Sequence, residues 1–376
     1  MRRGGCEASG NVATRRPDQR HTQRSASVTD DVIGVGIAGF WHVHAPDYAR
    51  NATEHPATRV VAGWDSDDSL AADGVAGLGI ERAASLDELL ARPDVDAITV
   101  TTATADHTDV ISRAIRAGKH VFTEKLLAPT VADSEALAAA ARDAGVALVV
   151  SLPRLSEREI VAASGLVDSG VLGEITYARV RMAHDGWLGG WLPERFADPV
   201  AAVGGAFADL GCHPAYLVQR FLGARPAQVT AAYGSVTGRA VEDNAVVVAR
   251  YTDGALGVAE ASFVTTPGAF AFEVRGTRGS LLYGFGREEL IGKGGELGDD
   301  WTPVPLPEAA TAPFDLWVDA IRGGADTADN VRAAIELTRF VIAANTAAAT
   351  GAAVDIDIDI DTDTDTDTDT DTEGRS

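Results

Sequence analysis

The stretch "VIGVGIAGF" at residues 32–40 decides the fold, because an apolar run leads directly into a glycine-rich turn. Its glycines, Gly34, Gly36 and Gly39, fit the pattern G-x-G-x-x-G, and Ile37 and Ala38 complete the turn. Between a strand and a helix, this spacing lets the backbone turn tightly and approach a pyrophosphate at the N-terminus of the helix. The stretch therefore predicts a dinucleotide site formed by these residues.

The region around this turn repeats one pattern. Helical stretches separate five short apolar runs, at residues 32–37, 59–64, 96–102, 119–124 and 146–151. Strands that alternate with helices form parallel sheets whose connections cover both faces. We therefore expect residues 31–150 to form an NAD-binding α/β Rossmann domain with a doubly wound parallel sheet.

The pattern changes at about residue 174, where strand-like runs follow one another with only short turns between them. These runs occupy residues 174–184, 227–236, 244–251, 255–264, 271–276 and 279–285, and helical patterns follow at 313–324 and 330–349. Such an order predicts an α/β domain at residues 151–358 with an open, mostly antiparallel sheet. An uncovered sheet is a liability in a monomer, so we expect this domain to bind substrate and to form a homo-oligomer, a dimer or tetramer.

Both ends of the chain differ from this globular region. Residues 1–30 are polar and rich in arginine, and they lack the apolar segment of a secretory signal. The tail at residues 359–376 repeats Asp-Thr and cannot bury a face, although the first Asp-Ile alternation before it can finish a strand. We expect both ends to be disordered and dispensable, and the chain to be able to start at Val28.

The net charge of the chain excludes some classes of binding partner. Of the net charge of −23 at pH 7, −16 belongs to residues 32–354. So acidic a protein repels nucleic acid phosphates and anionic membranes, and no run approaches the roughly 18 apolar residues of a membrane span. Only three of the 32 basic residues are lysines, and an acidic, lysine-poor composition is typical of halophilic proteins. Two cysteines without a framework spacing favour a cytoplasmic protein.

A carboxylate follows the second apolar run. Asp65 stands 26 residues after Gly39, at the place where an acidic residue accepts the ribose hydroxyls of NAD. The adjoining stretch "DSDDSL" at residues 65–70 contains no arginine or lysine that would hold the 2′-phosphate of NADP. The pattern therefore predicts NAD as the cofactor, with NADP less favoured. Alternatively, Asp65 and the acidic residues after it form a solvated turn without a role in cofactor binding.

Two further stretches complete a resemblance. They are "TTATADHTDVISRAIRAGKHVFTEKL" at residues 101–126 and "GGAFADLGCHPAYLVQRFLG" at residues 204–223. With the glycine turn, they resemble the Gfo/Idh/MocA family of nicotinamide-dependent sugar and polyol oxidoreductases over residues 32–354. The resemblance implies a Rossmann domain, an E-K-P motif after its fifth strand, and a C-terminal domain with a D-x-G-x-H helix. It also implies cofactor contacts from Thr102, His107 and Glu124; for His107, a capping or packing role is the alternative.

Two motifs carry over residue by residue. Glu124 and Lys125 match E-K, while Leu126 stands where the family has proline. Proline would fix the backbone, so its absence predicts that the lysine is less firmly aimed. Asp209 and His213 match the second motif. Their spacing of i and i+4 predicts that both address one pocket from one face of a helix.

These residue types suit the oxidation of a secondary alcohol and the reverse reduction. His213 can take the hydroxyl proton near neutral pH. Lys125 can polarise the carbonyl or share that proton, because the pKa of a lysine, unlike that of an arginine, shifts on burial. Asp209 can bind substrate hydroxyls and orient the imidazole. Either Lys125 or His213 can be the base, and Tyr216, where many members have aspartate, alters the rim of the pocket.

Other residues are candidates for the substrate pocket. Trp187 and Trp191 lie in a glycine-rich loop after the run at 174–184, where aromatic faces either stack on a sugar or pack the loop. Arg154, at the domain junction, is a further candidate. His42 and His44 alternate after the glycine turn, but no third ligand is evident from the sequence, so we predict no metal.

Taken together, these patterns predict an NAD(P)-dependent oxidoreductase. It would transfer a hydride between nicotinamide and a hydroxyl or carbonyl carbon of a small carbohydrate, which is a sugar, a sugar acid or a cyclic polyol. The alternatives are a catalytically silent, NAD-binding regulatory protein and an NAD-using glycosidase of the same family. A regulatory protein has no need of Lys125, Asp209 and His213, and a glycosidase would release free sugar without net formation of NADH.

Overall fold

The computed structural model describes residues 32–356, so the predicted N-terminal extension, the start at Val28 and the Asp-Thr tail lie outside the described residues. Its first sheet has six parallel strands in the order β3-β2-β1-β4-β5-β6. The order reverses between β1 and β4, which opens the crevice where doubly wound folds bind dinucleotides. All five apolar runs form strands, which confirms the Rossmann prediction. The strands are β1 Ile33–Ala38, β2 Thr58–Trp64, β3 Glu81–Arg82, β4 Ala97–Val100, β5 His120–Thr123 and β6 Leu148–Val150.

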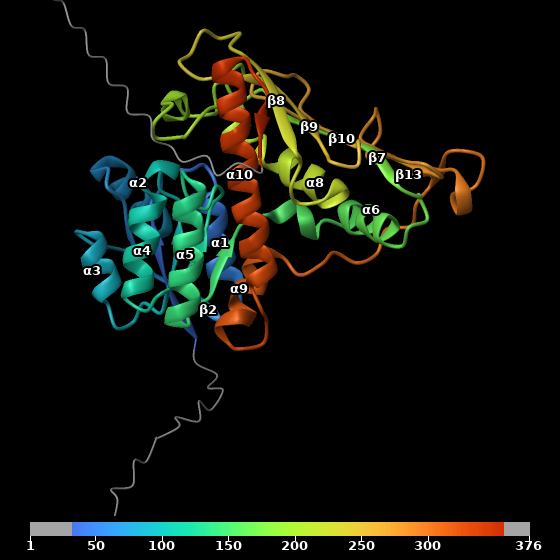
Figure 1. The fold of residues 1–376 in the computed structure, drawn as a ribbon. Coiled ribbons are helices and arrows are strands. Elements are labelled where there is room, and N and C mark those ends of the chain that lie inside the picture. The colour runs from blue at the N-terminus through green and yellow to red at the C-terminus, as the bar shows by residue number, and fades with distance from the viewer. Residues whose placement is uncertain (1–31, 357–376) are drawn as a thin grey trace, which may run out of the picture. The chain divides into compact units, whose positions relative to one another are not determined.

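Helices cover both faces of this sheet (Figure 1). Phe122 in β5 packs in one cluster with α1 and α9, whereas its neighbour Val121 packs in the cluster that includes α3, α4 and α5. Helix α9 comes from the segment that the sequence assigns to the second domain, so a distant part of the chain completes the first core. The helices are α1 Ala45–Glu54, α2 Asp68–Leu78, α3 Leu86–Ala91, α4 His107–Arg116, α5 Val131–Ala144 and α9 Pro313–Ile321.

The second sheet has nine strands in the order β14-β13-β12-β11-β7-β10-β9-β8-β15. The pair β7–β10 is parallel and the other pairs are antiparallel, which confirms the prediction of a mostly antiparallel sheet. The last strand, β15, begins the Asp-Ile alternation, as expected. The strands are β7 Ile175–Ala183, β8 Gln228–Gly234, β9 Asn244–Arg250, β10 Leu256–Ser262, β11 Ala269–Gly276, β12 Ser280–Tyr283, β13 Ile291–Lys293, β14 Thr302–Pro303 and β15 Val354–Asp355.

The helices α6 (Arg158–Asp168), α8 (Cys212–Leu222) and α10 (Ala328–Thr350) lie on one side of this second sheet (Figure 1). Gly257 in β10 approaches α8 so closely that an added Cβ would meet Val218 Cγ1 at 2.4 Å. Because side chains alternate along a strand, Val258 and Glu260 project from the opposite face. Within residues 32–356, none of the helices combines the length and apolarity needed to span a bilayer.

Helix α10 joins the two sheets. Near its start, Asn330 Nδ2 donates a hydrogen bond to the Val150 carbonyl of β6 at 2.9 Å. Near its end, Asn345 Oδ1 accepts one from Tyr233 Oη of β8 at 2.9 Å. The ends of the parallel strands are thereby fixed relative to the second sheet, and the junction between them carries the residues singled out in the sequence.

Candidate active site

The glycines of the turn are required by close contacts. Gly34 and Gly36 lie inside β1, and a Cβ on Gly34 would meet the Asp94 carbonyl oxygen at 1.9 Å. Gly39 has a φ of +99°, and a Cβ there would meet the Thr102 amide nitrogen at 2.4 Å. The turn therefore lies directly against the end of β4, in the crevice between β1 and β4.

Asp65, the predicted partner of the ribose hydroxyls, braces this turn. Its Oδ2 accepts a hydrogen bond from the Phe40 N–H at 2.5 Å, and its Oδ1 accepts one from the Asp67 N–H at 2.8 Å. A basic residue is also close, because Arg195 of the second domain donates through Nε to the Trp41 carbonyl at 2.5 Å. Ribose binding by the remaining lone pairs of Asp65 stays a prediction, and the bracing of the loop is an additional role.

Two other predicted cofactor residues are buried beyond the end of β4. Thr102 is 4% exposed, and its Oγ1 has no hydrogen-bond partner within the described part of the chain. His107 is fully buried; its Nδ1 donates to the Leu126 carbonyl at 2.7 Å, and burial lowers its pKa to about 4. This contact agrees with the packing alternative, while its Nε2 has no hydrogen-bond partner among the described residues, so cofactor binding by His107 stays a prediction. The orphaned Thr102 hydroxyl beside Gly39 fits a polar ligand such as a dinucleotide.

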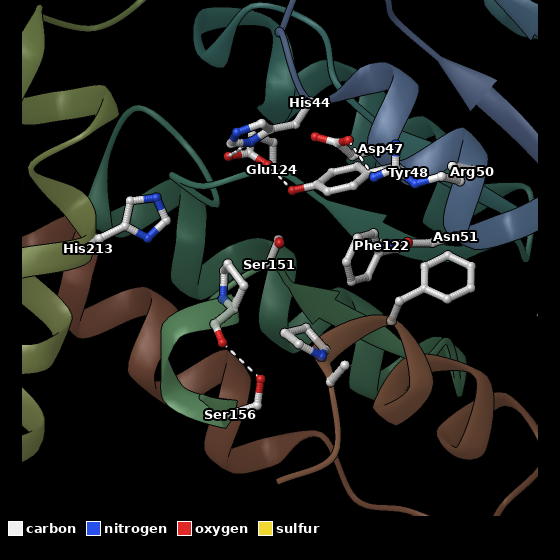
Figure 2. Close-up of a pocket in the computed structure, with 14 residues that line it drawn as sticks. His44, Asp47, Tyr48, Arg50, Asn51, Phe122, Glu124, Ser151, Ser156 and His213 are labelled. Carbon is white, nitrogen blue, oxygen red and sulfur yellow. Dashed lines mark hydrogen bonds and ion pairs between the residues drawn. The ribbon is translucent and has the colours of Figure 1, made fainter. Parts of the chain in front are cut away.

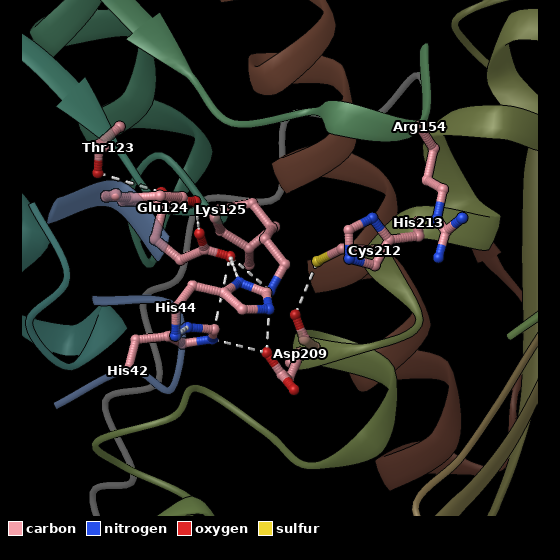
Figure 3. A network of polar contacts seen from close by, with 12 residues as sticks. His42, His44, Thr123, Glu124, Lys125, Arg154, Asp209, Cys212 and His213 are labelled. Atoms are coloured by element: carbon pink, nitrogen blue, oxygen red, sulfur yellow. Dashed lines mark hydrogen bonds and ion pairs between the residues drawn. The ribbon is translucent and has the colours of Figure 1, made fainter. Parts of the chain in front are cut away.

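Lys125 lies at the centre of a buried polar network (Figure 3). Its Nζ is 2.7 Å from Glu124 Oε1 and donates to Asp209 Oδ1 at 2.9 Å. The side chains of Lys125 and Glu124 are each only 2% exposed. Leu126, which follows through a cis peptide bond, is buried as well. The ammonium group is therefore aimed by its two ion pairs, despite the absence of the family's proline.

Electrostatics keep this network ionised. Burial opposes the charge on Lys125, but the carboxylates of Asp209 and Glu124 outweigh it and raise the pKa of the lysine above its usual range. Burial likewise opposes charge on both carboxyls, yet Lys125 outweighs it and holds the pKa of each below its usual range. An ammonium with a raised pKa keeps its proton at neutral pH. Lys125 is thus suited to act as a fixed positive charge rather than as a base.

The two histidines after the glycine turn join the same network. His42 Nδ1 accepts a hydrogen bond from the His44 N–H at 3.2 Å, and its Nε2 donates to Asp209 Oδ1 at 3.0 Å. Ligand atoms of His42, His44 and Glu124 lie within 4.8 Å of one another, so the fold supplies the third candidate ligand that the sequence did not reveal. The Lys125 ammonium group lies 2.7 Å from Glu124 Oε1, and its positive charge would repel a metal cation bound there. We therefore interpret these side chains as the surroundings of Lys125 rather than as a metal site.

His213 reaches the site from the second domain, but not on the predicted helix. Helix α7 (Ala206–Asp209) ends at Asp209, and α8 begins at Cys212. The prediction that Asp209 and His213 share one face of a continuous helix is therefore wrong. The interruption falls at Gly211, where a Cβ would meet Phe207 Cδ2 at 2.5 Å. The expectation that Asp209 orients the imidazole is also corrected, because its observed partners are Lys125 and His42.

Tyr216 orients His213 instead. Its hydroxyl lies 2.8 Å from His213 Nδ1 and accepts a hydrogen bond from the Arg154 N–H at 3.1 Å. Burial, reinforced by the charges of Lys125 and Arg154, lowers the pKa of His213 well below its usual value. When Nδ1 donates to Tyr216, Nε2 of the neutral ring keeps a lone pair for a proton. Of the two candidate bases, the imidazole has the suitable charge state.

A cavity of about 260 Å³ lies beside this network and is lined by residues from both domains (Figure 2). Glu124 and His213 both line it, and so do uncharged polar side chains such as Asn51 and Ser151. Phe314 from α9 contributes to an aromatic wall. The other lining residues are His44, Asp47, Tyr48, Arg50, Phe122, Pro153, Ser156, Ala312 and Pro313.

The predicted substrate residues lie elsewhere. Trp187 is 7% exposed and packs its ring against Phe263 at 4.9 Å between centroids, so it packs the loop. Trp191 is 52% exposed and donates through Nε1 to Asp185 Oδ1 at 3.1 Å. The Arg154 guanidinium is paired with Glu157. None of the three predicted residues lines the cavity of Glu124 and His213, because the fold fills that space from α1 and α9 instead.

Sequence reasoning missed the contribution of helix α1. Tyr48 donates a hydrogen bond to Glu124 Oε2, and Asn51 lines the cavity one turn later. His44, Tyr48 and Asn51 recur at the spacing of one helical face, which is the signal that could have found them. Their polar character was visible in the sequence, but the cavity that they face was not.

Two family models match consecutive parts of the chain. Residues 32–152 match the model of the oxidoreductase family with an NAD-binding Rossmann fold, and residues 160–282 match the GFO/IDH/MocA C-terminal domain. The scyllo-inositol 2-dehydrogenase (NAD(+)) of Bacillus subtilis (strain 168) is 26% identical over 315 residues, which cover 78% of this chain and 86% of that enzyme. The 1,5-anhydro-D-fructose reductase of Ensifer adhaerens is 35% identical over 205 residues, which cover 53% of this chain and 60% of the reductase.

The solved structures agree on the fold. Levoglucosan dehydrogenase in complex with NADH and levoglucosan aligns with a TM-score of 0.74 at 20% sequence identity, over 87% of this chain and 100% of that chain. Both domains, the glycine turn and the E-K motif thus occur together in the order that the resemblance implied. The chain belongs to the Gfo/Idh/MocA family of oxidoreductases.

Proposed function

We propose that this protein is an NAD(H)-dependent oxidoreductase that interconverts a hydroxyl and a carbonyl group of a sugar, sugar acid or cyclic polyol. The observation that carries the proposal is a cavity lined by His213 and by Glu124, whose Oε1 lies 2.7 Å from the Lys125 ammonium group. Relatives named as polyol dehydrogenases and as an anhydrosugar reductase support the substrate class.

Each side chain has one task in this proposal. Bound NAD(H) accepts or supplies the hydride. In the oxidative direction, His213 takes the hydroxyl proton through Nε2, and the ammonium group of Lys125 stabilises the negative charge that develops on the oxygen. Asp209 and Glu124 hold Lys125 in place and charged, and Tyr216 holds the imidazole. In the reductive direction the same groups polarise the carbonyl and return the proton.

The cofactor would lie along the crevice between β1 and β4. The backbone of residues 34–39 forms its turn, and Asp65, Thr102 and Glu124 are the side chains that we assign to it. His107 supports this site indirectly through the Leu126 carbonyl. The cavity below Glu124, with its uncharged polar groups and aromatic wall, suits a ligand that has both hydroxyl groups and an apolar ring face.

A spectrophotometric screen tests this function. Purified protein is mixed with NAD and a panel of sugars, sugar acids, cyclic polyols and glycosides, and both the absorbance of NADH and the release of free sugar are followed. Steady NADH formation with at least one compound is expected. Release of free sugar without net NADH would identify the glycosidase alternative instead. Tight NAD binding without turnover of any panel member would favour the regulatory alternative.

The charge of Asp65 should make the enzyme prefer NAD over NADP. A buried carboxylate repels the 2′-phosphate, and each tenfold preference corresponds to about 1.4 kcal/mol. Asp65→Ala and Asp65→Asn should both lower the ratio of the dissociation constant of NADP to that of NAD. Both constants are measured by tryptophan fluorescence. If both variants weaken NAD and NADP equally, Asp65 only braces the loop through the Phe40 N–H. Equal binding of both cofactors by the wild type would also contradict the prediction.

The outer face of the second sheet should form a homo-oligomer contact. Val246 and Leu256 are each 41% exposed. Glu260 of β10 lies opposite Val246 in the strand register, and it accepts a hydrogen bond from Arg179 of β7 at 2.9 Å. A surface with apolar groups and both signs of charge can pair with its own copy. Light scattering should show an oligomer at micromolar concentration, and Val246→Glu should dissociate it. Val200→Glu, at an exposed position in a loop, is the control that should leave the mass unchanged; a monomeric wild type would reject the contact.

A further inference from the structure

A carboxylate from a distant loop holds the short helix that carries Asp209. Helix α7 has only four residues, Ala206–Asp209, and Glu242 lies just before strand β9. The Oε1 atom of Glu242 accepts hydrogen bonds from the Gly205 N–H at 3.1 Å and from the Phe207 N–H at 2.8 Å. Its main-chain carbonyl accepts a third from the Ala206 N–H at 3.0 Å. Glu242 therefore caps this helix through space.

The helix depends on this external cap. Its own N-cap residue, Gly205, makes no side-chain cap, and one turn of helix is too short to be stable by itself. The fit is close, because a Cβ on Gly205 would meet the Glu242 carbonyl oxygen at 2.3 Å and its Oε2 at 2.7 Å. The preceding residue Gly204 has a φ of +138°, so the turn into the helix is also one that glycine favours. Glu242 thus defines where α7 begins.

The other end of α7 carries Asp209, the ion-pair partner of Lys125. Asp209 Oδ1 accepts hydrogen bonds from Lys125 Nζ at 2.9 Å and from His42 Nε2 at 3.0 Å. At a rise of about 1.5 Å per residue, the two ends of this helix are only about 6 Å apart. A displacement of the start of α7, where Glu242 binds, therefore also displaces Asp209 at its end. The Lys125 ammonium group, which is paired with Asp209, would then change its position.

A purely local role for Glu242 is less consistent with the contacts. The loop that contains it is closed by the adjacent residue Asp243, whose carboxylate accepts hydrogen bonds from the Val236 N–H at 2.9 Å and from the Thr237 N–H at 2.7 Å. The side-chain hydrogen bonds of Glu242 go to α7 instead. The two neighbouring acids thus have separate partners, which provides a matched pair for experiment.

We propose that Glu242 is a positioning residue that aligns Asp209 with Lys125 through helix α7. This inference rests on the proposed oxidoreductase function. Its critical feature is the reach of the Oε1 acceptor to two amides, rather than the charge of the carboxylate.

Two conservative variants separate reach from charge. Glu242→Gln keeps the reach and an acceptor oxygen, whereas Glu242→Asp keeps the charge but withdraws the oxygen by one methylene group. Glu242→Asp should lower kcat by about 10²-fold, the scale of a misplacement of roughly 1 Å, with the KM for NAD nearly unchanged. Glu242→Gln should stay close to the wild type. Asp243→Asn is the control, which should lower the melting temperature without this loss of kcat.

A second measurement does not depend on turnover. In protein labelled with ¹⁵N-histidine, the Nε2 signal of His42 reports its hydrogen bond to Asp209; it should shift in Glu242→Asp and remain in place in Glu242→Gln. A wild type without dehydrogenase activity would defeat the proposed function, and the His42 signal would still test the alignment. The inference is overturned if the two Glu242 variants behave alike, if Gln is the more damaging, or if Asp243→Asn reproduces the loss of kcat.

Discussion

Lys125→Ala should lower kcat by about 10²–10⁴-fold while the affinity for NAD stays nearly unchanged. The ammonium group is held by Glu124 and Asp209, and Glu124 lines the cavity together with His213, where we propose that the reacting oxygen binds. Removing a preorganised positive charge from a buried site leaves the developing charge on that oxygen without compensation. The turnover number and the dissociation constant of NAD, measured on the same preparation, check this expectation.

The same variant should change the pH dependence of stability. In the wild type, the raised pKa of Lys125 stabilises the fold below the unfolded value of about 10.4, and this contribution is lost as the pH rises through the folded value. The lowered pKa values of Glu124 and Asp209 stabilise the fold above about 4, and their contribution is lost as the pH falls. Lys125→Ala leaves two buried carboxylates without their ammonium partner, although His42 and Tyr48 still contact them. Its melting temperature should therefore fall most at neutral pH and recover part of the difference near pH 4.

Lys293→Ala is the control for Lys125, because this lysine is exposed on β13, away from the site. It should keep the wild-type kcat. The double variant of Lys125 and His213 should lose less than the product of the two single losses, since groups that act as a unit are not additive. A Lys125→Ala enzyme with wild-type kcat would remove Lys125 from the mechanism. A higher kcat for Leu126→Pro than for the wild type would show that the ammonium group of Lys125 is better oriented when a proline follows it.

The sequence motifs located the main candidate site residues, because these motifs consist of residues that are close together in the sequence. Gly34 and Gly39 report close backbone approaches that exclude a Cβ, and Gly36 packs tightly under the Leu89 side chain, so their pattern is readable without a structure. Lys125 and Asp209 were found through family motifs, and the fold brings their side chains within 2.9 Å. Elements with strong periodicity were predicted in the same way, whereas β3, β13 and β14 are two or three residues long and carry no period.

The errors arose where tertiary contacts override local pattern. The i and i+4 spacing of Asp209 and His213 suggested one helix, but Gly211 packs against Phe207 and divides it. For Trp187 the sequence left a substrate wall and loop packing open, and the contact with Phe263, just after β10, favours packing. Helix α9 follows the second sheet in the sequence but packs on the first. The contacts of Trp187 and of α9 leave no trace in a single sequence, because each depends on a partner far along the chain, whereas the break at Gly211 involves Phe207, only four residues away.

His213→Ala should lower kcat for oxidation by about 10²–10⁴-fold and remove the acid limb of its pH profile. A base must be neutral before it can take a proton. Burial lowers the pKa of His213 well below 6.5, so oxidation by the wild type should stay constant down to pH 6.5 and fall only at lower pH. Reduction needs the protonated ring, so its rate should rise as the pH falls. Profiles of kcat in both directions, at saturating cofactor, measure these limbs.

Tyr216 and a remote histidine supply the controls for His213. Tyr216→Phe keeps the ring but loses the hydroxyl 2.8 Å from His213 Nδ1, so its loss of kcat should be smaller than that of His213→Ala. Tyr216→Asp places a carboxylate beside the imidazole, which should raise the pKa of His213 and move the acid limb of oxidation to higher pH. His120→Ala, at the start of β5 and so at the strand end opposite Glu124, should change neither profile. An acid limb of oxidation that persists in His213→Ala would belong to another group, and His213 would then no longer be the base.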